Sequence, residues 1–511
     1  MEEPGPARRR ALAALRPWLF LVVVIALAAA LLAPYRHFTT DDAFIHFRFA
    51  RHLARGDGFS YNQGVPTYGD TAPLWVLSVA PLGLALVRIG AAPAVMHASC
   101  GGMDAWHLAA KLLDAGAILL AVVCFALLAR RRLGRYTGAT LAACLLFVID
   151  PWWVKWGMAG METPLAVLLA LAALRCRDLA RDSGRVDVWT PLTIGVGFLV
   201  RPEMALFGVA LVVDILANER RRRRADLVAA LTGGLLPVVP WLVYAAATFG
   251  TVVPNTFAAR QDVNYSLAYV VVKLGKILAS AYAVPLVAIV VALIAGRRAA
   301  GGERWGRINL FPLLSIALVL GFYVGARVSV GARYVLLVSP FILLLGYEVL
   351  IGALDTTRAR RVLRGAVLVA IAVLLLGVQV IAVRFVTRWP LGLDGHLFDI
   401  ACFLRDETPP GAVVAAHEIG VLGHVSERPI VDLAALVSPD LTPYSRTGSV
   451  ARSLGGRHVD YLVWNANEHP DRRLLDDMAG RLTPLLVRRV HREGSSHRGG
   501  WQYYTVYRVR P

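Results

Sequence analysis

The chain has 511 residues, of which 57% are hydrophobic and only 17% are charged. A soluble protein of this length needs a larger polar surface, and many apolar runs approach the length that spans a bilayer, so we expect a polytopic membrane protein. The net charge of +19 does not indicate a nucleic-acid partner, because the basic residues gather in short clusters between apolar runs, as in cytoplasmic loops.

The first apolar run, Trp18–Leu32, follows an arginine cluster between Arg8 and Arg16. More spans follow and a small-residue cleavage site is not clear, so we interpret this run as a retained first helix with a cytoplasmic N-terminus. Placing the later arginine clusters inside as well predicts about eleven transmembrane helices with the C-terminus outside. These spans lie near Trp18–Leu32, His107–Leu128, Ala139–Ile149, Met161–Leu174, Trp189–Val200, Met204–Ala217, Ala225–Thr248, Ala281–Ala295, Leu310–Gly325, Val335–Ile351 and Ala366–Phe385.

The run Ala72–Ile89 is apolar enough to span, but a crossing there would move the next arginine cluster outside. We therefore expect a helix lying at the outer interface, with Trp75 as an anchor. The first outer loop then covers residues 33–106, which is too long for a simple connector.

The chain is expected to divide into a transmembrane domain, residues 1–388, and an extracytoplasmic α/β domain, residues 389–511. In the second part Gly411–Ala416, Val459–Trp464 and Tyr503–Val509 read as strands. Phe398–Arg405 and Leu474–Leu482 read as helices. The five cysteines have no spacing typical of a zinc site or a disulfide framework.

With this topology, charged and polar residues from loops distant in sequence gather at the outer rim. Basic residues in short outer loops run against the positive-inside bias, so they call for an anionic ligand such as a lipid phosphate. The residues concerned are Asp41, Asp42, Glu162, Arg201, Glu203, Asn255, Arg260, Arg327 and Arg333.

Each of these residues also has a plain structural interpretation. A helix that begins near Asp41 puts positions 41, 44, 48, 51 and 55 on one face, and its aspartates suit the helix N-terminus. Its arginines are typical of a face that lies on the membrane interface. Glu162 would cap the next span, Arg201-Pro-Glu would form a turn with a local ion pair, and Arg327 and Arg333 would reach lipid headgroups. His417-Glu418, with His424 nearby, matches no standard metal spacing, so no metal site is predicted.

Several short motifs resemble, in matching order, those of the GT-C membrane glycosyltransferases. The likeness covers nearly the whole chain and is strongest to the actinobacterial arabinofuranosyltransferases that use decaprenyl-phosphate arabinose. Tyr68-Gly-Asp-Thr-Ala departs from the family pattern, which has an aromatic residue after the glycine and Ser, Asn or His before the proline. The matching motifs are Asp41-Asp42-Ala-Phe-Ile, Gly56-Asp-Gly-Phe-Ser-Tyr-Asn, Thr71-Ala-Pro-Leu-Trp, Gly160-Met-Glu-Thr-Pro-Leu, Arg201-Pro-Glu, Pro254-Asn-Thr-Phe, Gly331-Ala-Arg-Tyr, Ile419-Gly-Val-Leu-Gly and Arg428-Pro-Ile-Val-Asp-Leu.

The resemblance implies a GT-C fold, a polyprenyl-phosphate sugar donor with arabinofuranose as a candidate sugar, and inverting transfer to a cell-envelope glycan outside the plasma membrane. It implies an acidic base in the first outer loop, which we assign to Asp41, with Asp42 orienting it or the acceptor. Glu162 and Glu203 are acceptor or supporting candidates. Arg201, Arg260, Arg327 and Arg333 are candidates for the donor phosphate, and a divalent cation is left open.

Three other functions were weighed against this one. A lipid or glycan transporter or flippase should show charges at mid-membrane in paired halves, whereas here they cluster at one rim and no repeat is visible. A receptor would leave the rim charges unexplained. A lipid phosphotransferase or oligosaccharide ligase would need another nucleophile or a metal.

Overall fold

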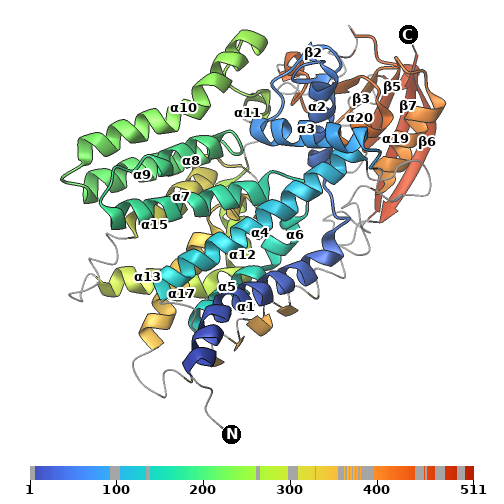
Figure 1. The fold of residues 1–511 in the computed structure, drawn as a ribbon. Coiled ribbons are helices and arrows are strands. Elements are labelled where there is room, and N and C mark those ends of the chain that lie inside the picture. Colours follow the sequence, from blue (N-terminus) through green and yellow to red (C-terminus); the bar gives the residue numbers. More distant parts are fainter. Residues whose placement is uncertain are drawn as a thin grey trace.

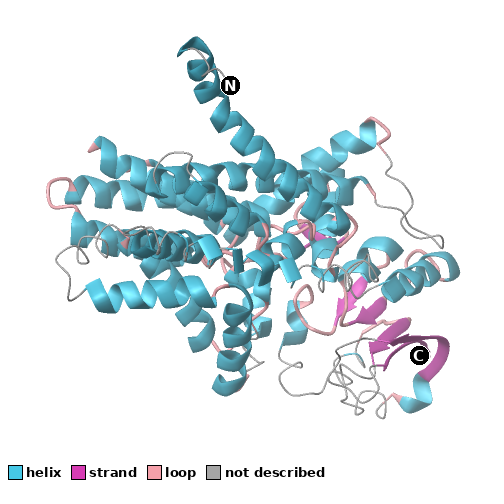
Figure 2. Cartoon of the chain, turned by 90° about the horizontal axis from the view of Figure 1, so that it is seen from below, coloured by secondary structure: helices cyan, strands magenta, loops and turns pink. Residues whose placement is uncertain are grey.

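The computed structural model describes residues 6–91, 104–133, 138–260, 265–296, 309–354 apart from residue 329, 395–442, 457–465, 478–491 and 501–510, with residue 454 and scattered positions between 362 and 380. Most of these residues form a helical bundle, and a five-stranded sheet lies at one end of it (Figures 1 and 2).

The bundle contains most of the expected apolar helices. The final expected span, Ala366–Phe385, lies largely outside the described residues. The helices of the bundle are α1 (Pro6–Leu32), α4 (Ala105–Leu133), α5 (Gly138–Val148), α6 (Pro151–Gly157), α7 (Thr163–Ser183), α8 (Trp189–Phe198), α9 (Met204–Asn218), α10 (Arg223–Phe249), α12 (Leu267–Ala281), α13 (Ala283–Gly296), α15 (Leu310–Gly325) and α17 (Ser339–Leu354).

By length and apolar character, α4 and α10 each suffice to cross a membrane within the described residues. Two further spans arise if each bent pair, α5 with α6 and α12 with α13, is taken as one. The break between α5 and α6 has a local cause, because the Asp150 carboxylate caps α6 by accepting from the backbone N–H groups of Trp152 and Trp153. The total of about eleven spans stays a prediction.

Two helices differ from the sequence interpretation. The amphipathic helix α12 was not expected, and it meets α13 at an angle of 98°. The apolar helix α3 (Pro73–Arg88) exists as expected, but the side chain of Trp75 is only 1% exposed. Trp75 therefore packs in the protein core and is not an anchor that faces lipid.

The rim opposite the sheet is held together by buried ion pairs. The guanidinium of Arg177 contacts the carboxylates of Asp187, Asp214 and Glu219 at 2.7–3.2 Å. Arg132, in the last turn of α4, contacts both Asp178 of α7 and Glu348 of α17. Because a buried charge is stable only when it is paired, these contacts fix the ends of α4, α7 and α9 relative to one another.

The first outer loop folds into helices α2 (Asp41–Arg55) and α3, a short hairpin of β1 (Ser60–Asn62) and β2 (Val65–Pro66), and the turn η1 (Ala33–Tyr35). Two short helices, α11 (Asn255–Arg260) and α16 (Ala332–Val335), lie in other loops. Helix α2 begins at Asp41 as predicted and ends at Arg55. The next residue, Gly56, has a φ of 90°, in the left-handed region that glycine adopts easily.

The C-terminal sheet has the strand order β4-β3-β5-β7-β6, in which β3 pairs in parallel with β4 and β5, and β7 pairs antiparallel with β5 and β6. The expected strands are confirmed, as is the helix near Phe398, but β4 and β6 were missed. The described part of Leu474–Leu482 is a 3-10 turn that leads into β6, not a helix. The elements are α19 (Gly395–Glu407), β3 (Val414–Ala416), α20 (Gly420–Ser426), β4 (Ile430–Asp432), η2 (Pro439–Leu441), β5 (Tyr461–Asn465), η3 (Ala479–Arg481), β6 (Leu482–His491) and β7 (Trp501–Val509).

The topology predicts which surfaces are accessible from outside the cell. In a variant whose free cysteines Cys124, Cys144 and Cys176 are replaced by serine, Gln63→Cys should react with an impermeant thiol reagent in intact cells. Ser183→Cys should react only after the membrane is opened. Both positions are exposed in the structure, so burial does not explain a difference. The reverse labelling pattern would contradict an outer position of the first loop.

Candidate functional site

A cavity of about 930 Å³ lies where the first outer loop, several interhelical loops and the C-terminal domain meet. The chain reaches it from segments that are far apart in sequence, so the fold, not a local motif, creates the site. Its lining includes Asp42, Ile45, His46, Gly69, Asp70, Glu162, Phe198, Arg201, Glu203, Leu206, Val252, Val253, Phe257, Phe322, Tyr323, Arg333, Tyr334 and Leu436.

Asp42 and Arg333 face each other across part of this cavity. A guanidinium N–H of Arg333 donates to the Asp42 carboxylate at 2.6 Å, and the Asp42 side chain remains 48% exposed. The guanidinium also lies over the rings of Trp156 and Tyr334, with centroid distances of 5.6 and 5.2 Å. Arg333 is therefore fixed by an ion pair and two aromatic faces, and it does not extend freely into a lipid headgroup layer.

A second ion-pair network also lines the cavity. Arg201 contacts Glu162 at 2.7 Å and Glu203 at 3.9 Å. Tyr323 donates its hydroxyl to Glu203 at 2.5 Å. Glu162 directly precedes α7 but its side chain makes no capping hydrogen bond there, so the expected capping role is wrong and its carboxylate pairs with Arg201 instead. The expected local pair within Arg201-Pro-Glu, between Arg201 and Glu203, is the longer of the two contacts.

His46 joins this network to Asp70. Its Nδ1 lies 2.5 Å from Asp70 and its Nε2 lies 3.3 Å from Glu162. Burial alone would lower the pKa of His46, but the two carboxylates outweigh it and raise the pKa to about 10. Burial also opposes ionisation of Glu162, yet Arg201 and His46 hold the pKa of that carboxyl well below its usual range. His46 is thus an imidazolium between two carboxylates at neutral pH.

The cavity lining also contains many apolar side chains. They include Ile45, Phe198, Leu206 and Phe322, together with valines from the loop before α11. The cavity therefore suits a ligand with an anionic or polar head and a long apolar part.

Asp41 lies on the other side of α2 from the cavity. Its two carboxylate oxygens accept hydrogen bonds from the backbone N–H groups of Gly420 and Val421, at 2.9 and 2.7 Å. Burial raises the pKa of Asp41 to about 6, against the effect of these two hydrogen bonds. Asp41 is not among the residues that line the cavity. Of the two aspartates, only Asp42 lines it.

The remaining predicted residues fall into four groups. Glu162, Arg201, Glu203 and Arg333 are brought together as described. Arg327 is exposed, with a φ of 50°, and does not line the cavity. The side chain of Arg260 lies outside the described residues, although its helix α11 begins beside the cavity. Arg48 and Arg51 are buried against the C-terminal domain, so the expectation that they lie on the membrane interface is wrong.

His46 and Asp70 were missed by the sequence interpretation. A single histidine inside an apolar helix face carries no signal of its own. Asp70 did carry one, because it lies in Tyr68-Gly-Asp-Thr-Ala, the segment that departs from the family pattern. Among the described residues, no three His, Cys, Asp or Glu side chains are arranged to hold a metal ion.

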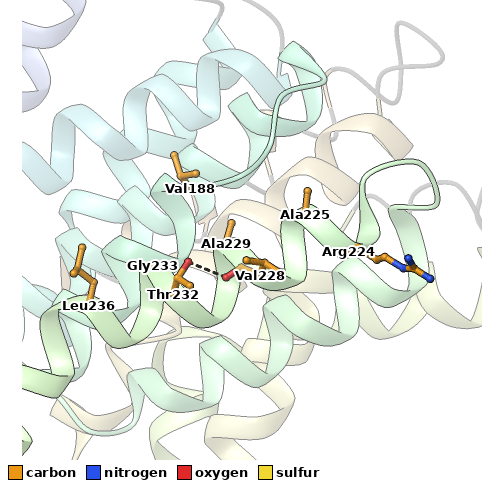
Figure 3. Close-up of a pocket in the computed structure, with 8 residues that line it drawn as sticks. All are labelled: Val188, Arg224, Ala225, Val228, Ala229, Thr232, Gly233 and Leu236. Carbon is orange, nitrogen blue, oxygen red and sulfur yellow. Dashed lines mark hydrogen bonds between the residues drawn. The ribbon is translucent and has the colours of Figure 1, made fainter.

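A second hollow, of about 570 Å³, lies along α10 beside Val188 (Figure 3). Its lining is apolar or small apart from Thr232, which donates its hydroxyl to the Val228 carbonyl at 2.8 Å, and Arg224 at one end. It lacks the paired carboxylates and guanidiniums of the first cavity, so we do not regard it as a reaction site.

Comparisons with known proteins agree with this architecture. Residues 104–244 match the family model described as dolichyl-phosphate-mannose-protein mannosyltransferase, and residues 388–507 match a domain family of unknown function. A terminal beta-(1->2)-arabinofuranosyltransferase of Mycobacterium tuberculosis is 28% identical over 241 residues. That match covers 44% of this chain and only 35% of the relative, so it spans about a third of the relative's length.

Solved structures match over nearly the whole chain. The crystal structure of ArnT from Cupriavidus metallidurans bound to undecaprenyl phosphate superimposes with a TM-score of 0.60 and 17% identity, and covers 96% of this chain and 97% of that one. The apo oligosaccharyltransferase of Archaeoglobus fulgidus gives a TM-score of 0.58 with 12% identity, and covers 94% of this chain and 74% of that one. At these identities the likeness concerns the fold.

The charged state of His46 predicts a particular dependence of stability on pH. Its pKa is about 10 in the folded protein and 6.5 for the free side chain, so the folded state binds the extra proton between these values. The free energy of unfolding should therefore fall as pH rises from about 6.5 to 10, by up to about 1.4 kcal/mol per pH unit. A thermal melt series in detergent measures this slope.

Two variants make the pH test specific. His46→Gln should melt at a lower temperature than wild type at neutral pH. Its free energy of unfolding should also no longer fall steeply between about pH 6.5 and 10. His52→Gln is the matched control, because burial lowers the pKa of His52 to about 4, outside the window. Equal slopes in wild type and His46→Gln would contradict an imidazolium between Asp70 and Glu162.

Proposed function

Because the chain has the fold of the GT-C superfamily of membrane glycosyltransferases, we propose that it transfers a sugar from a polyprenyl-phosphate donor to a glycan acceptor. The observation that carries this proposal is the Asp42–Arg333 pair in a cavity that is lined by both charged and apolar side chains. A lipid-linked sugar has matching parts: an apolar chain, an anionic phosphate and a polar sugar.

The arginines supply what the leaving group needs. A polyprenyl phosphate leaves with its own negative charge, so it requires a cation and not a proton. The guanidinium of Arg333 has five N–H donors, and it can hold the Asp42 carboxylate with one and phosphate oxygens with others. Bound in this way, the phosphate and the carboxylate would contact different N–H groups of one guanidinium. Arg201 is the second cation available in the cavity.

Asp42 is the better candidate for the general base. A base must come within hydrogen-bond reach of the acceptor hydroxyl, and the Asp42 side chain is half-exposed in the cavity. The oxygens of Asp41, which we expected to be the base, accept bonds from the backbone of Gly420 and Val421. We therefore exchange the two roles and treat Asp41 as a residue that holds the site together.

The chemistry follows as a single displacement. The oxygen of the acceptor hydroxyl attacks C1 of the sugar while Asp42 takes the proton of that hydroxyl. The C1–O bond to phosphate breaks, and its electron pair leaves with the polyprenyl phosphate. Attack from the face opposite the leaving group inverts the configuration at C1. One base and a cation suffice for this route, whereas retention through a covalent intermediate needs a second carboxylate as nucleophile.

Arabinofuranose is our candidate for the sugar, and a cell-envelope glycan is our candidate for the acceptor. The support for both is the arabinofuranosyltransferase relative, which is 28% identical over part of its length. Glu162 and Glu203 lie in the cavity but are held by Arg201. We assign them to shaping the acceptor side, not to proton transfer.

We place the reaction at the outer side of the plasma membrane, with the N-terminus of the chain in the cytoplasm. The arginine clusters support this orientation. Cys402 in α19 is disulfide-bonded, which the cysteine spacing did not indicate. Disulfides persist in oxidising compartments, so this bond also supports an extracytoplasmic C-terminal domain.

Removing the charge of Asp42 tests the proposal. Asp42→Asn keeps the size of the side chain but cannot take a proton, so turnover should fall roughly 10²- to 10⁴-fold with donor affinity changed much less. The measurement is transfer of sugar by purified protein, with the melting temperature recorded alongside. Asp57→Asn is the matched control, because Asp57 lies in the turn after α2 and outside the cavity.

Wild-type turnover in Asp42→Asn would contradict the proposal. An Asp42→Asn protein that folds, binds donor and turns over at the wild-type rate would remove Asp42 as the base. Glu162 would then be the next carboxylate of the cavity to replace.

A further inference from the structure

Two motifs of the C-terminal domain, Ile419–Gly423 and Arg428–Leu433, take no part in the reaction proposed above. Both nevertheless contact the first outer loop. Together with the loop that follows, they form the segment Ile419–Ser438, which contains α20 and β4. Its contacts with α2, the β1 strand and the cavity are numerous and largely buried.

The first contact is made by Asp41 at the start of α20. The backbone N–H groups of Gly420 and Val421 donate to its two oxygens. The fit leaves no space for a side chain at position 420, since a Cβ there would overlap the backbone oxygen of Asp41. The start of α20 can therefore lie this close to the start of α2 only with both the Asp41 carboxylate and a glycine at position 420.

The second contact extends along the same face of α2. Arg48 donates to the backbone carbonyls of Gly423 and, at 2.9 Å, Arg428. Arg51 donates to the His424 carbonyl and to the Glu427 carboxylate, both at 2.8 Å. The Arg48 and Arg51 side chains are buried, so each guanidinium replaces its water with backbone oxygens of the C-terminal domain.

The hairpin of the first outer loop adds a third contact. The Tyr61 hydroxyl donates to the Ile419 carbonyl at 2.6 Å. The Asn62 side chain both donates to the Ile430 carbonyl, at 2.8 Å, and accepts from the Ile430 N–H, at 2.9 Å. This two-way pairing fixes the position of β4 relative to β1.

Apolar packing joins the two parts into one core. Buried side chains of α2, α3 and the outer end of α4 form a single cluster with those of α19, β3, α20 and β4. The rings of Phe44 and Phe398, for example, meet edge to face with centroids 5.5 Å apart. Domains that move independently do not share a core of this kind.

The segment also supplies part of the cavity wall. Asp432 is fully buried, and its carboxylate accepts from the N–H groups of Ala434 and Val437 at 2.8 and 2.9 Å. This fixes the loop that carries Leu436, which lines the cavity. The same loop presses on Gly69, where a Cβ would lie 2.6 Å from a methyl carbon of Val437.

We propose that the C-terminal domain is a structural part of the transfer site, in which Ile419–Ser438 acts as a clamp on α2. Asp41 and Asp432 are then positioning residues: Asp41 fixes the end of α2 that presents Asp42, and Asp432 fixes the loop that presents Leu436. This inference rests on the proposed transferase function. It differs from the view that the domain is a separate module that only recruits the acceptor, because it requires the clamp even for a small, soluble acceptor.

The test combines a structural and a kinetic measurement. Spin labels at Gln63→Cys and Glu407→Cys, in protein without its free cysteines, report the distance between the β1–β2 hairpin and the C-terminal domain. Transfer to a short synthetic acceptor gives kcat and the donor KM. The variants are Gly420→Ala, which crowds the start of α20, and Asp41→Asn, which keeps only one acceptor oxygen. Gly411→Ala is the matched control, because no atom lies within 4 Å of a Cβ placed there.

We expect Gly420→Ala to broaden the label distances and to lower kcat about tenfold or more, with the donor KM changed less than about threefold. Asp41→Asn should also lower kcat more than it changes the donor KM, but to a smaller degree. This second variant keeps the test available if Gly420→Ala does not fold. Gly411→Ala should match wild type in both measurements.

Three outcomes would overturn parts of this account separately. Broadened distances with unchanged kcat in Gly420→Ala and Asp41→Asn would show that the clamp does not position Asp42. Unchanged distances in both variants would show that the clamp does not depend on Asp41 and Gly420. A wild-type protein that transfers no sugar would defeat the proposed function, and the positioning claim with it, whereas the label distances would still decide whether the clamp exists.

Discussion

Helix α2 carries charge on two faces, and the end of the protein that includes the C-terminal domain is arranged around this division. Successive residues of an α-helix are separated by about 100°, so the adjacent Asp41 and Asp42 point in different directions. Asp41, Arg48 and Arg51 face the C-terminal domain. Asp42 and His46, one helical turn apart, face the cavity. A rotation of this helix would disturb both sets of contacts together.

The charges of the cavity face, most of which are buried, are stabilised by pairing. Each carboxylate there has a cationic partner: Asp42 has Arg333, Glu162 has Arg201 and His46, and Asp70 has His46. Removing one partner of such a set leaves an uncompensated charge, which costs far more than the pair contributes. The network is therefore rigid before any donor binds, and in our proposal this lowers the cost of ordering the site during transfer.

Much of the helical architecture could be predicted from the sequence, because long apolar runs and arginine clusters are strong signals. Helix α15 occupies the expected Leu310–Gly325 and α2 begins at the expected Asp41. The sequence also singled out Asp42, Glu162, Arg201, Glu203 and Arg333, because charges in short outer loops are unusual, and the fold brings these five residues to one cavity.

What the sequence could not supply was the direction of each side chain and the partner it meets. Asp41 and Asp42 are equivalent in a string of letters, and only the docking of α20, more than 370 positions later, separates their surroundings. Arg48 and Arg51 suggested a membrane interface for the same reason, because most of their partners are backbone carbonyls of the C-terminal domain, which leave no mark in composition. His46 was missed since its meaning depends on Asp70 and Glu162, which the fold brings to it from two other segments.

The central claim is that the cavity around Asp42 and Arg333 transfers sugar from a lipid phosphate. The most direct measurement incubates purified protein with a panel of polyprenyl-phosphate sugars and a glycan acceptor, and quantifies the polyprenyl phosphate released. We expect release with at least one sugar. It should depend on the acceptor and be strongly reduced in Arg333→Gln, because the leaving phosphate loses its cation. Release that is undiminished in that variant would contradict the assignment of this cavity, and no release from any donor across a broad panel would contradict the function itself.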